Sequence, residues 1–430
     1  MMVELVKKKL NSGMGKDVAW TFALQIIIML CSFAINKILS NRLSIDDFGQ
    51  YNVIKRSVQV LSFVMLAGVG ISLPRYIPIY KESIPRKPIG PLLCASLLFM
   101  TITLLGICIG CHLIPARVSH LITGQVDGGA LLAIALAYGF AQALARFVYA
   151  YYRGVGNFKW YNGAQLAVQL AIILPLLLWP VLTTSTVFTS WLIVTALFVA
   201  FYMVRELWMK HFSVSDLLGW MPMLGSNLMT IFRYSSWRML ADFFLFSLSA
   251  FPLIYVSSHQ GLQSTAYYSV GVTFVTMVTP VFSFMGIILL PYVSQCVIRN
   301  EMKKANRFVN KLAMLYIGVS LLITLVMGLF ICSLTRLFFA ESYVVTANLS
   351  RIMIFSILPQ VLYLLYRNPI DAVAVFPYNM LILGICLVAM ILAFSCLDTI
   401  EEFAWAYLGV SLLQGILSWL TWKLLQNKKI

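Results

Sequence analysis

The chain of 430 residues is 61% hydrophobic and only 11% charged, with a mean hydropathy of +0.89. Soluble proteins are about half apolar and about a quarter charged, so a water-soluble fold is excluded. The formal net charge is +16, but the cations lie in gaps between apolar runs, which argues against nucleic-acid binding. The eight cysteines lack the spacing of zinc or iron–sulfur sites, so we expect packing residues and neither a metal nor another cofactor.

The apolar runs, taken in chain order, predict membrane-spanning helices. The first begins at Val18, continues for about 20 residues and lacks a small-residue cleavage site, so we expect an uncleaved span rather than a signal peptide. The runs show no barrel-type alternation. The sequence therefore predicts an all-α polytopic membrane protein of about twelve transmembrane helices. The later runs are 53–74, 91–114, 129–150, 163–182, 187–208, 235–256, 267–292, 312–333, 348–366, 373–396 and 403–422.

Lys and Arg are distributed unevenly between the two sets of predicted loops. Most of them lie in the segments that are on the same side of the membrane as the N-terminus. The alternate loops contain only Arg42, Arg117 and Arg336, together with several acidic residues. Because positively charged short loops resist translocation, we expect both termini in the cytoplasm.

The two halves of the chain resemble each other. A shift of about half the length aligns Trp20 with Trp237 and Tyr51 with Tyr268, and the order of the predicted spans matches as well. These matches favour an internal duplication. Both copies start on the same side of the membrane, so we expect parallel repeats related by an axis along the membrane normal.

No predicted loop is long enough to hold a soluble catalytic or nucleotide-binding domain, and the phosphate-loop motif is absent from the sequence. We therefore expect two six-helix lobes, 1–208 and 229–430. The intervening segment 209–228 has leucines and methionines on one helical face, which predicts a linker along the cytoplasmic membrane surface.

Two segments resemble a known family. The opening segment GKDVAWTFALQIIIMLCSFAINKILSNRLSIDDFGQYNV, in which Phe48-Gly49-x-Tyr51 leads into the second run, resembles polysaccharide flippases of the Wzx type, and so does STAYYSVGVTFVTMVTPVFSFMGIILLPYVS. These flippases belong to the multidrug/oligosaccharidyl-lipid/polysaccharide exporter superfamily. The resemblance implies a V-shaped pair of six-helix bundles in a bacterial plasma membrane. Such a protein moves undecaprenyl-diphosphate-linked oligosaccharides from the cytoplasmic to the outer leaflet by alternating access, and whether the glycan ends as O antigen, capsule or another polymer stays open.

Six cations lie within or at the margins of the predicted spans. A charge at the bilayer centre costs at least about 2.5 to 3.5 kcal/mol, so each needs a polar cavity, a partner or a route to the headgroups by snorkelling. In a cavity, these cations would offset the desolvation of a diphosphate, and Arg can bind phosphate oxygens in a bidentate way. Both interpretations stay open. The candidate substrate-binding residues are Lys37, Lys55, Arg56, Arg233, Arg238 and Arg351.

Asp242 is the acidic residue that lies well inside a predicted span. Arg238 stands four residues earlier, so both side chains share one helical face. An intrahelical ion pair, a cavity-lining group and an ion-coupling carboxylate are the three interpretations of Asp242.

Two other functions are weighed against a flippase. An ion-coupled exporter of small molecules in the same superfamily would place acids in its cavity for cationic drugs, whereas cations outnumber acids inside these spans. A membrane glycan polymerase or ligase needs a large outer loop with catalytic charges, and the outer loops here are short. We expect a transporter rather than an enzyme, acting as a monomer on a lipid-linked oligosaccharide among membrane lipids, without nucleic acid; a polysaccharide polymerase and its chain-length machinery are candidate partners.

Overall fold

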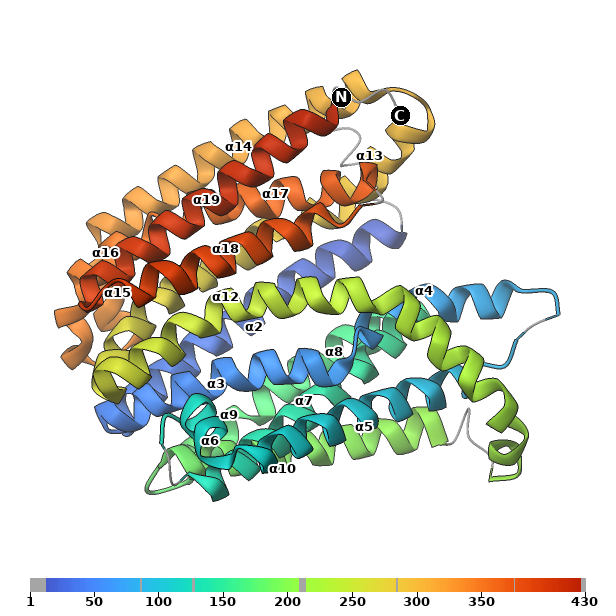
Figure 1. Cartoon of the computed structure of the whole chain (residues 1–430), viewed down its shortest axis with the longest axis horizontal. Coiled ribbons are helices and arrows are strands. Elements are labelled where there is room, and N and C mark those ends of the chain that lie inside the picture. The colour runs from blue at the N-terminus through green and yellow to red at the C-terminus, as the bar shows by residue number, and fades with distance from the viewer. Residues whose placement is uncertain are drawn as a thin grey trace. The chain divides into compact units, whose positions relative to one another are not determined.

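A computed structural model describes residues 13–85, 87–125, 128–208, 214–283, 285–374 and 376–426 (Figure 1). The chain divides into two compact units. The first contains Met1–Leu43 and Ser57–Met239, and the second contains Ser44–Arg56 and Leu240–Ile430. Two helices, α3 and α12, each contribute one part to each unit, so the units are not two uninterrupted halves of the sequence.

Helices of the first unit surround α7 (Gly129–Gly154), which packs against α4, α8 and α10. Local sequence signals set several ends. The Asn157 side chain accepts a hydrogen bond from the backbone of Trp160 and caps α8, and Thr183 and Thr186 form a capping box that begins α10. The other elements of this unit are α2 (Gly13–Arg42), α4 (Val69–Glu82), α5 (Gly90–Leu113), α6 (Pro115–Thr123), α8 (Phe158–Ala171), α9 (Ile173–Leu178), α10 (Thr184–Tyr202) and the π-helical turn η1 (Met203–Trp208).

The second unit is built around α17, which packs against α13, α14 and α19. Ser44 caps the start of α3 by accepting a hydrogen bond from the backbone of Asp47. Asp46 and Asp47 stand in the first turn, where their negative charges interact favourably with the helix dipole. Its elements are the first part of α3 (Ile45–Leu66), the second part of α12 (Val214–Ser283), α13 (Met285–Ile298), α14 (Met302–Leu329), α15 (Ile331–Phe338), η2 (Glu341–Thr346), α16 (Ala347–Ile354), α17 (Ile357–Val373), α18 (Tyr378–Ser395) and α19 (Ile400–Gln426).

The Phe48-Gly49-x-Tyr51 motif forms a packing site within the second unit. Phe48 is 1% exposed and Tyr51 is 0% exposed. The ring of Phe48 lies 5.2 Å from that of Tyr343, between centroids. A Cβ at Gly49 would stand 2.0 Å from the carbonyl oxygen of Leu262, so only glycine lets α3 approach α12 this closely. The motif therefore joins two helices of one unit.

The described residues contain ten helices that are long and apolar enough to cross a membrane, or eleven if the bent pair Glu341–Ile354 and Ile357–Val373 is one span. This confirms the prediction of an all-helical multi-pass membrane protein. One of the ten stretches, Met239–Thr279, covers two of the runs expected from the sequence. Gly261, with φ 83° and ψ 177°, interrupts the helical backbone between those two runs.

The segment expected to be an interfacial linker has two parts. Residues 209–213 lie outside the described part of the chain. From Val214 onward the backbone is helical and continues without a gap into the run expected from 235. The lobe boundaries and the surface position of this segment stay predictions.

Candidate functional site

Lys55 and Arg56 are adjacent cations in the part of α3 that belongs to the second unit. They lie about 15 Å along the helix from Ile45, at 1.5 Å per residue, which is about half the thickness of a bilayer's hydrocarbon core. Both side chains are half-buried. Cations at this distance from a helix end are poorly placed to snorkel to headgroups.

The surroundings of this pair are polar but neutral. A terminal nitrogen of Arg56, Nη2, donates a hydrogen bond to Oγ1 of Thr276 on α12 at 3.1 Å. Arg56 also interacts electrostatically with Tyr51 and Tyr407, and Nζ of Lys55 lies 5.3 Å from the ring centroid of Tyr51. Among the described residues, neither cation forms an ion pair with a carboxylate. Two positive charges thus stand side by side without an acidic partner among the residues that the structure describes.

A hydrogen-bonded group on α17 and α19 holds the tyrosine that faces Arg56. Nε2 of Gln360 donates to the hydroxyl of Tyr407 at 2.9 Å and to Oγ of Ser411 at 3.2 Å. The hydroxyl of Tyr407 is fixed in place by this amide. Neutral dipoles of this kind reduce the cost of burying a guanidinium without cancelling its charge.

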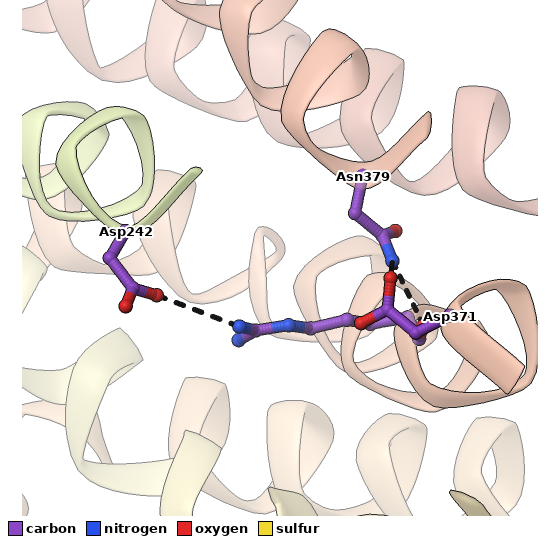
Figure 2. A network of polar contacts seen from close by, with 4 residues as sticks. Asp242, Asp371 and Asn379 are labelled. Atoms are coloured by element: carbon purple, nitrogen blue, oxygen red, sulfur yellow. Dashed lines mark hydrogen bonds and ion pairs between the residues drawn. The ribbon is translucent and has the colours of Figure 1, made fainter. Parts of the chain in front are cut away.

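A second charged group in the same unit joins α12, α17 and α18 (Figure 2). Oδ1 of Asp242 lies 3.7 Å from Nη2 of Arg367, and their side chains are 19% and 32% exposed. Nδ2 of Asn379 donates to Oδ1 of Asp371 at 2.7 Å and to the backbone carbonyl of Arg367 at 2.9 Å. Figure 2 shows Asp242 facing the guanidinium that reaches it from α17, with Asp371 and Asn379 paired beside the base of that side chain.

The ion pair expected between Arg238 and Asp242 stays a prediction, because the side chain of Arg238 lies outside the described residues. Within the described residues, Asp242 faces Arg367, and neither Arg367 nor Asp371 was among the candidate residues. A signal was available, because Arg367 and Asp371 have the i, i+4 spacing that places both on one face of α17.

The remaining candidate cations are dispersed. Lys37 is half-buried in α2 of the first unit, and its backbone carbonyl accepts a hydrogen bond from Asn41. Arg233 is exposed on α12. Arg351 is exposed on α16, where it donates to Oδ1 of Asn348 at 3.1 Å and to the carbonyl of Gly328 at 3.3 Å. Among the candidate cations whose side chains are described, only Lys55 and Arg56 lie side by side, and they are neighbours in the sequence.

Arg146 lies within α7, which continues beyond it to Gly154, and its side chain is half-buried. The guanidinium carbon lies 3.9 Å from the ring centroid of Phe63 on α3, a close cation–π contact. No group of three or more His, Cys, Asp or Glu among the described residues is arranged to hold a metal ion.

The fold of this chain is similar to the folds of several solved membrane transporters. The chain is similar to the MATE transporter VcmN of Vibrio cholerae, with 16% identity, a TM-score of 0.65 and coverage of 99% of this chain and 98% of that one. It is similar to an inward-facing MATE family multidrug resistance transporter of the MOP superfamily, with 12% identity, a TM-score of 0.68 and coverage of 94% and 99%. The lipid II flippase MurJ, in an inward closed conformation, gives 12% identity, a TM-score of 0.68 and coverage of 95% and 86%.

The sequence itself shows the family. Residues 14–297 match the model of the family described as polysaccharide biosynthesis protein. A search of curated proteins finds no significant match. The chain is thus an all-helical multi-pass membrane protein with the fold that these MATE transporters and MurJ share. The chain belongs to the polysaccharide biosynthesis protein family.

Proposed function

We propose that the protein is a flippase that moves undecaprenyl-diphosphate-linked oligosaccharides from the cytoplasmic to the outer leaflet of the bacterial plasma membrane by alternating access. The family match ties the chain to polysaccharide biosynthesis. The fold is shared with a lipid II flippase, a transporter whose name states a lipid-linked cargo. In this proposal both termini are cytoplasmic, as the distribution of Lys and Arg predicts.

The observation that carries the proposal is the pair Lys55–Arg56. Two adjacent cations without a carboxylate partner among the described residues create a strong positive potential in a low-dielectric region. An anion that brings its own charge, such as a diphosphate, is the ligand that best satisfies them. The planar guanidinium of Arg56 can bind phosphate oxygens with two parallel hydrogen bonds, and the ammonium of Lys55 adds a point charge beside it.

We assign Asp242 as the ion-coupling candidate within the same proposal. Asp242 is a half-buried carboxylate inside an expected span, and a second carboxylate, Asp371, lies in the same group, so a proton or another monovalent cation can bind there. The membrane potential, negative inside, also favours outward movement of an anionic headgroup by about 2.3 kcal/mol per charge per 100 mV. Asp242 is therefore the residue at which we expect any ion dependence to originate.

Mass spectrometry of lipid-linked glycans tests the proposal in cells depleted of this protein while the sugar-assembly enzymes remain. We expect single, unpolymerised units to accumulate on the cytoplasmic face and to disappear on re-expression. Units that reach the outer leaflet but stay unpolymerised would move the assignment to a later enzyme. An unchanged lipid pool would favour an ion-coupled exporter of small molecules, since the MATE transporters share this fold.

A further inference from the structure

Helix α7 carries a polar face along most of its length. Tyr138, Gln142, Arg146, Tyr149 and Arg153 follow one another at spacings of three or four residues, so they lie on one side of the helix. The rest of α7 is largely apolar, and many of its residues are buried against α4 and α10. A membrane helix with a polar face turns that face away from lipid.

Contacts along this face connect it to α3, through Arg146 and Phe63, and to α8. Nε2 of Gln142 donates to the hydroxyl of Tyr138 at 2.6 Å. The rings of Tyr149 and Tyr161 meet edge to face at 6.4 Å between centroids, and the guanidinium carbon of Arg153 lies 6.0 Å from the ring centroid of Tyr161. Tyr161 therefore links the polar face of α7 to the start of α8.

Helix α8 continues the polar surface toward α2. Tyr161, Gln165 and Gln169 stand at i, i+4 and i+8 and share one face of α8. Nε2 of Gln25 on α2 donates to Oε1 of Gln165 at 3.1 Å, and Nε2 of Gln169 donates to Oγ of Ser32 at 3.4 Å. All of these residues belong to the first unit. The half-buried glutamines and tyrosines of α7 and α8 define an amide–aromatic surface: Gln142, Tyr149, Tyr161, Gln165 and Gln169.

The glutamines of this surface keep hydrogen-bonding capacity after their contacts within the chain. Each carboxamide offers two N–H donors and two acceptor sites on its oxygen. Gln142, Gln165 and Gln169 are half-buried, and within the described part of the chain each makes one of these bonds. Free amide groups in a membrane helix are costly against lipid, so they need a polar ligand or water.

We propose that the amide–aromatic surface binds the oligosaccharide part of the lipid-linked cargo. Sugar hydroxyls both donate and accept hydrogen bonds, which matches carboxamides, and the apolar face of a sugar ring packs on an aromatic ring. None of these side chains is acidic, and Arg146 and Arg153 stand on the same face of α7, so the surface disfavours a cationic drug. This inference rests on the proposed flippase function and assigns recognition of the glycan to the first unit.

Binding of two probes to the full-length protein in nanodiscs tests this inference. One probe is undecaprenyl diphosphate, and the other is the diphosphate-linked oligosaccharide pool extracted from the depleted cells. We expect wild-type protein to bind the glycan-bearing probe more tightly. The double variant Gln142→Met, Gln165→Met keeps side-chain length and removes the amides, so its affinity for the glycan-bearing probe should fall about tenfold while its affinity for undecaprenyl diphosphate stays unchanged.

Gln263→Met is the matched control, because Gln263 is an exposed glutamine of the second unit whose amide donates only to Tyr267. It should bind both probes like the wild type. Amides that merely hold helices together would, when removed, lower the thermal midpoint and weaken both probes equally, which would overturn the inference. Unchanged binding of both probes would also overturn it while leaving the flippase proposal intact. Failure of the wild type to bind either probe would contradict the flippase proposal, and the glycan assignment with it.

Discussion

At the scale of single residues, Arg56 and Asp242 differ in the charge of their described partners. Arg56 has one neutral hydrogen-bond partner, Thr276, and a neighbouring cation in Lys55. Asp242, in contrast, already faces the guanidinium of Arg367. The first site is suited to receive an anion, and the second is suited to exchange a cation or a proton.

Replacing Arg56 separates these roles. In Arg56→Gln we expect binding of undecaprenyl diphosphate to weaken about tenfold to a hundredfold, because a charge-assisted bidentate contact is lost. Arg56→Lys should recover part of the loss through its charge but not the bidentate geometry. Equilibrium binding in nanodiscs measures this. Arg351→Gln is the control, since Arg351 is exposed and bound to neutral groups; an equal loss in both variants would contradict the assignment.

Asp242→Asn should abolish any dependence of transport on a coupling ion, because the amide cannot carry the exchangeable charge. Transport rates measured in proteoliposomes with and without an imposed proton or sodium gradient check this. The variant needs a thermal midpoint close to that of the wild type, since Arg367 loses its charged partner. A folded variant whose ion dependence is unchanged would eliminate Asp242 as the coupling residue.

At the scale of helices, the close approach of α3 and α12 is set by one glycine. Gly49→Ala would place a Cβ 2.0 Å from the carbonyl oxygen of Leu262. We expect a destabilisation of about 1 to 3 kcal/mol from this overpacking, seen as a lower midpoint of thermal unfolding. Gly318→Ala on α14 is the matched change, because a Cβ there meets nothing within 4 Å. It should be neutral or slightly stabilising, and similar midpoints for both variants would refute the packing argument.

The helices themselves follow from the sequence because hydropathy over about 20 residues is a local property. The cations of the candidate site also followed from their position inside apolar runs. The ion pair of Asp242 with Arg367 did not, because Arg367 stands far away in the sequence and only the tertiary fold brings it close.

The Phe48-Gly49-x-Tyr51 motif shows a further limit of sequence reasoning. In the sequence, the motif stands at the start of the second expected span and contributes to the family resemblance. In the structure its residues fill a buried contact between α3, α12 and η2. A motif can thus be informative about the family while its side chains serve packing, and only the tertiary contacts separate the two roles.

At the scale of the whole molecule, the proposal fixes an orientation. Lys303, at the start of α14, should face the cytoplasm, and Glu341, beyond the end of α15, should face outward; both side chains are exposed. In a background without the native cysteines, Lys303→Cys should react with an impermeant maleimide only in inverted vesicles. Glu341→Cys should react only in intact cells or spheroplasts. The reverse labelling pattern would contradict the expected topology.

The measurement that tests the central claim most directly is translocation in proteoliposomes that contain the purified protein and the extracted diphosphate-linked oligosaccharide. A lectin or glycosidase added outside reports the glycans that have crossed. We expect rapid crossing with the wild type and with Lys303→Gln, an exposed loop-side control, and crossing slowed at least about tenfold in the double variant Lys55→Gln, Arg56→Gln. Equal rates in all three proteins, or no crossing above protein-free liposomes, would contradict the account.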